Sequence, residues 1–289
     1  MIPPAFEYLR PKTIPEAVAF LQQYGDDAKI LSGGQSLIPM MKFRLARPAY
    51  LVDINRISGL AYIKEEGGHL KIGGLTRESD LEHSDLIRAK YPIILDTAHV
   101  IADPQVRNLA TVAGNLAHGD PANDHPATML ALGAKVVATG PKGERVIPIE
   151  EFFVSLFTTA LQPDEIVTEI RIPTPPARSG GAYLKLERKV GDFATAAVAA
   201  QITLDDKGGC QKVGIGLTNV GPTPLKAGQA ESFLLGKKAD PANIEQAAAL
   251  AAADARPSSD LRGPAEYKKG LVKELTRRAL TRAVERAGR

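Results

Sequence analysis

One stretch decides the fold of this chain: Ile30-Leu31-Ser32-Gly33-Gly34-Gln35-Ser36-Leu37. It follows a short apolar segment and precedes an apolar and basic one that runs to Leu45, so a strand, a loop and a helix are expected in that order. Two adjacent glycines let the backbone approach a ligand closely, and successive N–H groups can then point at phosphate oxygens. The stretch therefore indicates a diphosphate-binding loop, although a glycine pair taken alone is more often an ordinary structural turn.

A second loop of small residues shifts the balance toward ligand binding. Thr111-Val112-Ala113-Gly114-Asn115 again combines a hydroxyl and an amide, and Gly119-Asp120-Pro121-Ala122-Asn123-Asp124 follows soon after. Two such loops can hold one dinucleotide from two sides. Neither matches the Rossmann pattern, because the nearest candidate, Gly214-Ile215-Gly216, has Asn219 where the third glycine should stand. A nicotinamide-type Rossmann site is therefore not indicated.

Short strands and helices alternate in the first part of the chain. Thr13-Ile14-Pro15-Glu16 has the pattern of a capping box, in which the Thr13 hydroxyl and the Glu16 carboxylate accept hydrogen bonds from amides of the first helical turn. The helix that it starts should run to about Tyr24. Strands are expected at Tyr50–Ile54, Leu70–Ile72 and Ile166–Ile172, with a hairpin at Gly140–Gly143 between Lys135–Ala138 and Arg145–Ile149.

A run rich in proline and glycine, Pro173 to Gly181, is the best candidate for a domain boundary. Strands are expected after it at Ala182–Leu186, Thr195–Thr203 and Val213–Thr218, then helices at Ile244–Ala255 and Ala265–Ala287. On the last helix, an apolar face is expected to consist of Tyr267, Leu271, Leu275 and Ala279. The basic residues of this helix, which include Lys268, are either solvated or dock a partner subunit.

Composition limits the chemistry that the chain can perform. The net charge is only +3 and the basic residues are interspersed with acids, so nucleic-acid binding is not expected. Cys210 is the only cysteine, which excludes an intrachain disulfide and an iron–sulfur cluster bound by this chain alone. His118, His125, Asp120 and Asp124 fit no standard zinc spacing, so no metal site is expected. With neither a transmembrane segment nor a signal core, a cytoplasmic location is expected.

The two loops resemble the flavin loops of the FAD-binding (medium) subunits of the molybdenum hydroxylase and xanthine dehydrogenase family. The resemblance covers essentially the whole chain, because it continues in order through Ile101–Arg107, Lys185–Lys189, Gly191–Thr195, Gly216–Val220 and Gly263–Tyr267. It implies an α+β fold with a two-subdomain FAD-binding unit of the vanillyl-alcohol-oxidase type, residues 1–56 and 57–176. A C-terminal flavoprotein domain, residues 177–289, would follow with a small antiparallel sheet and helices.

The same resemblance implies a set of FAD-binding residues and no catalytic residue on this chain. The set is Ile30, Leu31, Ser32, Gly33, Gly34, Gln35, Ser36, Leu37, Ile101, Thr111, Val112, Ala113, Gly114, Asn115, Asp124, Val167, Lys185 and Phe193. The Lys185 ammonium is expected to offset negative charge on the reduced flavin. Phe193 either lies near the flavin ring or packs in an aromatic core. The family usually has glycine where this chain has Ala113, and a left-handed backbone there would cost alanine about 1 kcal/mol.

The function that the resemblance implies is electron transfer within a larger oxidoreductase. Electrons would pass from a molybdenum-cofactor large subunit, through an iron–sulfur small subunit, to FAD on this chain and then to an external acceptor. The single cysteine agrees, because the clusters must belong to another chain. A stand-alone flavin-binding module and a self-contained flavin oxidase stay open as alternatives. Carbon monoxide, aldehydes and N-heterocycles are the substrates that the resemblance suggests for the complex.

Overall fold

The computed structural model describes residues 1–288, in which the strands form three larger sheets and one small hairpin. The first sheet is parallel, with the order β1-β3-β2, and consists of β1 (Glu7–Leu9), β2 (Ala28–Leu31) and β3 (Tyr50–Asp53). The second is antiparallel, with the order β4-β5-β10-β6-β7, and consists of β4 (Ile63–Glu66), β5 (His69–Gly73), β6 (Lys135–Gly140), β7 (Gly143–Pro148) and β10 (Ile166–Pro173). The third is antiparallel, with the order β11-β12-β13-β14, and consists of β11 (Ser179–Leu186), β12 (Ala196–Leu204), β13 (Cys210–Thr218) and β14 (Leu225–Lys226). The hairpin pairs β8 (Phe153–Ser155) with β9 (Thr158–Thr159).

Helices separate and cover these sheets. Those associated with the first two sheets are α1 (Ile14–Tyr24), the 3-10 turn η1 (Gly25–Asp27), α2 (Leu37–Lys42), α3 (Glu78–His83), α4 (Asp85–Lys90), α5 (Pro92–His99), α6 (Pro104–Arg107), α7 (Val112–His118), α8 (His125–Leu132) and α9 (Ile149–Phe152). Those after the third sheet are α10 (Gly228–Leu234), α11 (Pro241–Asp254) and α12 (Ala265–Ala287). The expected α+β class, with a small antiparallel sheet and helices in the C-terminal part, is confirmed.

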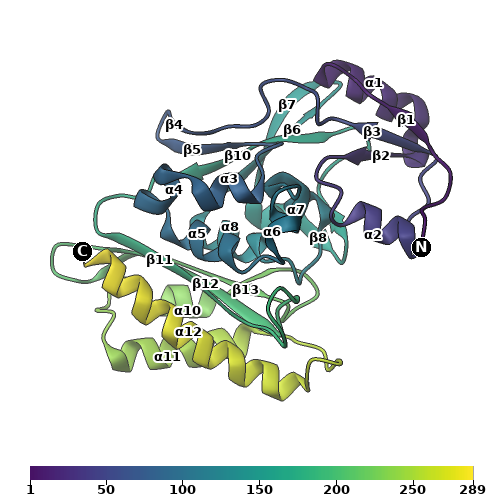
Figure 1. The fold of residues 1–289 in the computed structure, drawn as a ribbon. Helices are drawn as coiled ribbons and strands as arrows, with labels where there is room; N and C mark the ends of the chain where they lie inside the picture. Colours follow the sequence, from purple (N-terminus) through teal and green to yellow (C-terminus); the bar gives the residue numbers. More distant parts are fainter. Residues whose placement is uncertain (289) are drawn as a thin grey trace.

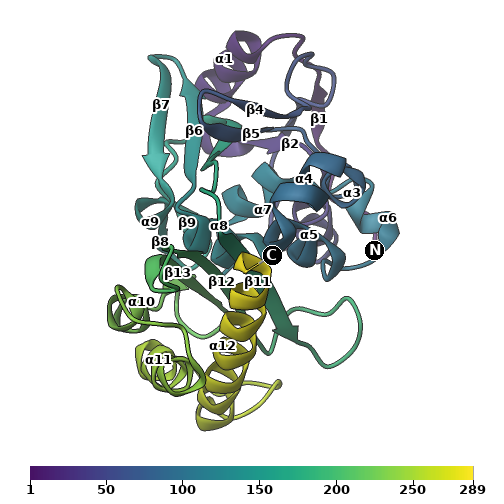
Figure 2. The same cartoon turned by 90° about the vertical axis from the view of Figure 1, so that its left-hand side faces the viewer.

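The elements are stacked in layers (Figures 1 and 2). The second sheet lies on one side of helices α3 to α8, and the third sheet lies on the other side of them. Helices α5 and α8 pack on one face of the third sheet while α12 packs on β11 and β12 from the opposite face, so this sheet is covered on both sides. Within residues 1–288, no helix combines the length and the apolar character that a membrane crossing needs.

Several predicted local signals are confirmed. The Thr13 hydroxyl accepts a hydrogen bond from the Glu16 N–H at 3.3 Å. The Glu16 carboxylate differs from the expected box in that it accepts from the Lys12 N–H, at 2.7 Å. The hairpin joins β6 to β7 with Gly140 opposite Gly143. Local capping and turn chemistry therefore sets these elements without help from distant residues.

The predicted boundary at Pro173–Gly181 is too long, because β10 ends at Pro173 and β11 already begins at Ser179. The pair Gly214 and Gly216 lies within β13, directly beneath the backbone of α8. A Cβ on Gly214 would stand 2.8 Å from the carbonyl carbon of Ala131, and one on Gly216 would stand 2.7 Å from that of Ala127. These glycines therefore let a helix approach a strand closely and bind no nucleotide.

The predicted apolar face of α12 is confirmed in part, because Ala279 is fully buried and Leu271 and Leu275 pack against the core, but the fully buried stripe of its first half lies one position further along the chain. Tyr267 is 49% exposed, whereas Lys268 is 1% exposed and continues into a buried stripe through Val272 and Thr276. The stem of Lys268 packs inward because its ammonium donates to the Ser258 carbonyl at 3.1 Å and to Asp260 at 2.7 Å. Helical periodicity allows two neighbouring stripes, and contact with β11 and β12 selects this one.

Candidate cofactor-binding site

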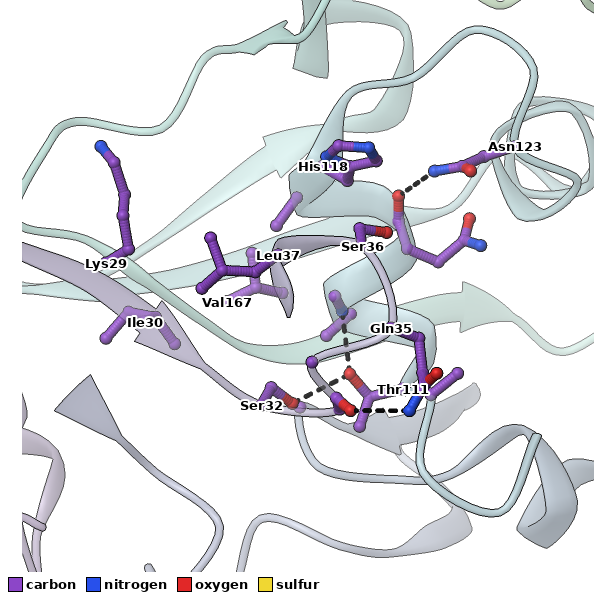
Figure 3. A pocket seen from close by; sticks show the side chains of 18 of the residues that line it. Lys29, Ile30, Ser32, Gln35, Ser36, Leu37, Thr111, His118, Asn123 and Val167 are labelled. Atoms are coloured by element: carbon purple, nitrogen blue, oxygen red, sulfur yellow. Dashed lines mark hydrogen bonds between the residues drawn. The ribbon is translucent and has the colours of Figure 1, made fainter. Parts of the chain in front are cut away.

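A cavity of about 580 Å³ lies where β2, α2 and α7 meet the start of β10, the end of β11 and the loop that follows β11 (Figure 3). This size falls within the range of about 300–1,000 Å³ typical of ligand sites. All of the predicted FAD-binding residues except Leu31 and Val112 line it. Side chains alternate along a strand, so Ile30 faces the cavity and Leu31 points away, while Val112 is fully buried in the core beneath α7.

The first loop is held against the second by close backbone packing. A Cβ on Gly33 would lie 2.8 Å from the Ala110 Cα and closer still to the Leu109 carbonyl oxygen. Gly34 adopts a left-handed backbone with φ of 74°, which glycine reaches without strain. The hydroxyls of Ser32 and Thr111 share a hydrogen bond of 2.9 Å, visible in Figure 3. The two loops predicted from the sequence therefore form one wall of the cavity.

Two residues that no sequence motif indicated, Asn55 and Arg77, hold this wall together through hydrogen bonds to backbone carbonyls. Asn55 donates to the Ser32 carbonyl at 2.8 Å and accepts from the Arg77 guanidinium at 2.5 Å. The other terminal nitrogen of Arg77 donates to the Leu109 carbonyl. Each of these contacts joins residues more than twenty positions apart, so no local pattern marks them.

The stretch predicted as the second loop is instead the start of helix α7, and Thr111 caps this helix, because its hydroxyl accepts from the Gly114 N–H at 3.1 Å. Ala113 lies inside α7 and is not among the positive-φ residues, so the strain expected for a left-handed alanine does not arise. Asn115 faces the cavity, and its buried side-chain oxygen has no hydrogen-bond partner among residues 1–288. A buried amide oxygen without a partner is costly, which favours a ligand that donates a hydrogen bond here.

Asp124 and Lys185 form a buried ion pair on the cavity wall. The Lys185 ammonium donates to Asp124 at 3.0 Å and to the Val100 carbonyl at 3.0 Å, and it lies 3.3 Å from Glu187. Its charge is therefore shared with two protein carboxylates, and its expected action on a reduced flavin stays a prediction. Burial raises the pKa of Asp124, while the Lys185 charge and hydrogen bonds from Tyr183 and Lys185 oppose that shift.

The aromatic ring of Phe193 lies at the rim of the cavity, next to the ion pair between Asp192 and Arg262. Phe193 is 45% exposed and lines the cavity, so core packing does not explain it. The Arg262 guanidinium lies 6.0 Å from the Phe193 ring centre and donates to Asp192 at 3.0 Å. Partial burial alone would raise the pKa of Asp192, but hydrogen bonds from Arg262 and Arg188 lower it to about 2. Asp192 is therefore ionised at neutral pH and ties the rim to the C-terminal part of the chain.

Further residues line the cavity without having been predicted. They include Lys29, Met40, Ile54, Gly74, Ala102, Val106, His118, Asn123, Gln162, Glu165, Ile166, Gly191 and Asp192. His118 packs on Phe157 with ring centres 5.1 Å apart, and burial lowers the pKa of His118. The sequence could have indicated three of them, since Asn123 and Asp192 lie within quoted motifs and His118 lies directly beside one.

The fold and this cavity define a dinucleotide-binding protein. Its loops offer close backbone approach at Gly33, clustered hydroxyls and an unpaired buried amide oxygen, all of which suit a flavin dinucleotide with its diphosphate and ribityl hydroxyls. The family described as the FAD binding domain in molybdopterin dehydrogenase matches residues 4–175, and the CO dehydrogenase flavoprotein C-terminal domain matches residues 181–283. The chain belongs to this family of FAD-binding flavoproteins.

Individual relatives cover the chain almost completely. The carbon monoxide dehydrogenase medium chain of Afipia carboxidovorans is 48% identical over 99% of both chains. A chain of carbon monoxide dehydrogenase from Hydrogenophaga pseudoflava matches with a TM-score of 0.96 and 48% identity over 99% of both chains. A chain of quinoline 2-oxidoreductase from Pseudomonas putida 86 matches with a TM-score of 0.92 and 31% identity over 99% of both chains. The fold is therefore shared by relatives from complexes that act on different substrates.

Proposed function

We propose that this chain is the FAD-binding electron-transfer subunit of a molybdenum-containing hydroxylase complex of the carbon monoxide dehydrogenase type. The observation that carries the proposal is the cavity formed by the two glycine-bearing loops, in a chain that matches carbon monoxide dehydrogenase medium chains from end to end. Bound FAD supplies the redox chemistry, since a flavin exchanges electrons singly or in pairs. The chain itself has one cysteine, so iron–sulfur clusters must lie on a partner subunit and the molybdenum cofactor on another.

The residues take distinct roles in this proposal. Ser32, Gly33 and Gly34 would bind the diphosphate through backbone N–H groups, with Thr111 and Asn115 opposite them. Asp124 and Lys185 would lie along the more buried part of the cofactor, and Phe193 would cover its accessible end at the rim. The remaining predicted contacts, Ile101 and Val167 among them, would supply apolar walls that exclude water.

Carbon monoxide is the proposed substrate of the complex, because the relatives at 48% identity carry that name. Aldehydes and N-heterocycles come next, since relatives at lower identity include a glyceraldehyde dehydrogenase medium chain and quinoline 2-oxidoreductase. A cytoplasmic location stays a prediction. The substrate is decided by assaying the intact complex on these three classes, with a dye acceptor and separately with NAD.

One purification tests the proposal against its alternatives. We expect the tagged chain to copurify with a cysteine-rich chain and a large molybdenum-cofactor chain, and to show flavin absorbance at one FAD per chain. A flavin-loaded chain that associates with no such partner would favour the stand-alone module. Substrate-dependent flavin bleaching by the isolated chain would favour the self-contained oxidase. Absence of flavin from both the complex and the chain after addition of FAD would refute the proposal.

A further inference from the structure

Asp124 accepts a hydrogen bond from Tyr183, a side chain that does not line the cavity. The Tyr183 hydroxyl donates to one carboxylate oxygen of Asp124 at 2.5 Å, while the Lys185 ammonium donates to the other at 3.0 Å. Tyr183 and Lys185 are two positions apart on β11 and therefore point to the same face of the sheet. Tyr183 is 2% exposed and absent from the cavity wall, whereas Asp124 and Lys185 are part of it. The hydroxyl thus acts on Asp124 without access to the ligand.

The charges around Lys185 do not cancel. Two carboxylates, Asp124 at 3.0 Å and Glu187 at 3.3 Å, surround the single ammonium, so the cluster carries an excess negative charge when both are ionised. The Lys185 side chain is 2% exposed, which makes this excess poorly screened by water. Protonation of Asp124 would make the cluster neutral. The charge facing the cavity therefore depends on which groups keep the Asp124 carboxylate ionised.

Tyr183 is well suited to keep the Asp124 carboxylate ionised. Burial and the neighbouring Asp124 carboxylate raise the pKa of Tyr183 well above its ordinary value, so the hydroxyl keeps its proton and can donate it in a hydrogen bond. Burial raises the pKa of Asp124, and the bond from Tyr183 is one of the contacts that oppose this rise. Thr218 on β13, with its hydroxyl 3.5 Å away, is the other partner of the Tyr183 oxygen.

We propose that Tyr183 is a positioning residue that keeps Asp124 ionised on the cavity wall, and that this ionisation adds its own contribution to the pH dependence that the reduction potential of a bound flavin already has. The inference rests on the proposed function. Reduction would bring two electrons from the iron–sulfur partner together with at least one proton from water, and a negative cluster would oppose the remaining negative charge more than a neutral one does. The proton that Asp124 takes up at low pH comes from water.

Other charged groups also lie around Asp124, and the Tyr183→Phe substitution removes none of them. They are Lys185 on β11, Glu187 after β11, His118 at the end of α7, His125 on α8, Glu78 on α3 and Asp192 at the rim. His125 and Glu78 are fully buried and hydrogen-bonded to each other at 2.6 Å. A comparison of variants at each pH therefore isolates the contribution of the hydroxyl.

The test measures the midpoint potential of the flavin in the intact complex, for Tyr183→Phe and for wild type, from mildly acidic to alkaline pH. Tyr91→Phe is the matched control, because Tyr91 is equally buried and donates to a carboxylate, Glu65, at 2.8 Å away from the cavity. We expect Tyr183→Phe to have the higher potential at intermediate pH, where Asp124 is protonated in the variant and ionised in the wild type, and to converge with wild type at more acidic and at more alkaline pH. A tenfold gain in the preference for reduced over oxidised cofactor corresponds to about 30 mV. Tyr91→Phe should follow wild type throughout.

Asp124→Asn provides an independent arm, since it makes the cluster neutral at every pH. Its potential should exceed that of wild type most at alkaline pH, where Asp124 is ionised in the wild type. Parallel potential curves for Tyr183→Phe and wild type would overturn the inference, because a purely structural hydroxyl has no reason to act over only part of the pH range. If Tyr183→Phe loses its flavin, an Asp124→Asn curve that coincides with wild type overturns the inference by itself. A wild-type complex without flavin would instead refute the proposed function.

Discussion

Replacing Gly33 by alanine tests whether the contact between the two loops controls FAD binding. The added Cβ would lie 2.8 Å from the Ala110 Cα and closer to the Leu109 carbonyl oxygen. Both are backbone atoms that cannot rotate away, so the loops must separate to accept the methyl group. Overpacking of this kind costs about 1–3 kcal/mol. Bound FAD needs the loops closed, so that cost should appear as a Kd for FAD raised about 5- to 150-fold.

The assay is a titration of the FAD-free chain with FAD, followed by flavin fluorescence, beside a urea unfolding curve that shows each variant is folded. Gly270→Ala is the control, because a Cβ at this position in α12 meets no atom within 4 Å. Alanine is favoured over glycine in a helix by about 1 kcal/mol, so this variant should unfold at higher urea and bind FAD as wild type does. A folded Gly33→Ala protein with wild-type affinity for FAD would refute the reasoning.

Three further outcomes follow from the structure. Thr111→Val removes the cap on the Gly114 N–H, so it should cost about 1 kcal/mol in urea unfolding and weaken FAD binding, whereas unchanged stability would contradict the capping role. The hydrogen bond from Arg107 lowers the pKa of Glu82, so the carboxylate stabilises the fold above the pKa of unfolded glutamate and this stabilisation is lost as pH falls through the folded value. Glu82→Gln should therefore be less stable than wild type at neutral pH and equal to it in acid, as measured by urea unfolding at several pH values. Burial raises the pKa of the Cys210 thiol, which is 1% exposed, so a thiol reagent should label native protein far more slowly than unfolded protein, and equal rates would contradict this.

Local sequence was informative wherever the determining contacts are close along the chain. The cap at Thr13 and the hairpin at Gly140–Gly143 each depend on residues within four positions of one another. The order of the small-residue motifs, their shared hydroxyl and amide chemistry and the family resemblance around them together indicated a dinucleotide site. The sequence also showed that Gly214 and Gly216 do not complete a Rossmann pattern. It did not show that they contact α8, because that contact involves residues more than eighty positions away.

The sequence by itself determined the glycine-bearing loop at Ile30–Leu37 and most strands and helices, because each follows from residue type and near-neighbour spacing. Only the tertiary structure decided that Asn55 and Arg77 brace the first loop, that α12 buries Lys268, and that Tyr183 and Lys185 share the Asp124 carboxylate. For the last of these, the physical reason is that Asp124 lies about sixty positions before Tyr183 and Lys185 in the chain. The energy of a buried charge depends on the partners that such long-range packing brings to it, and no local pattern encodes them.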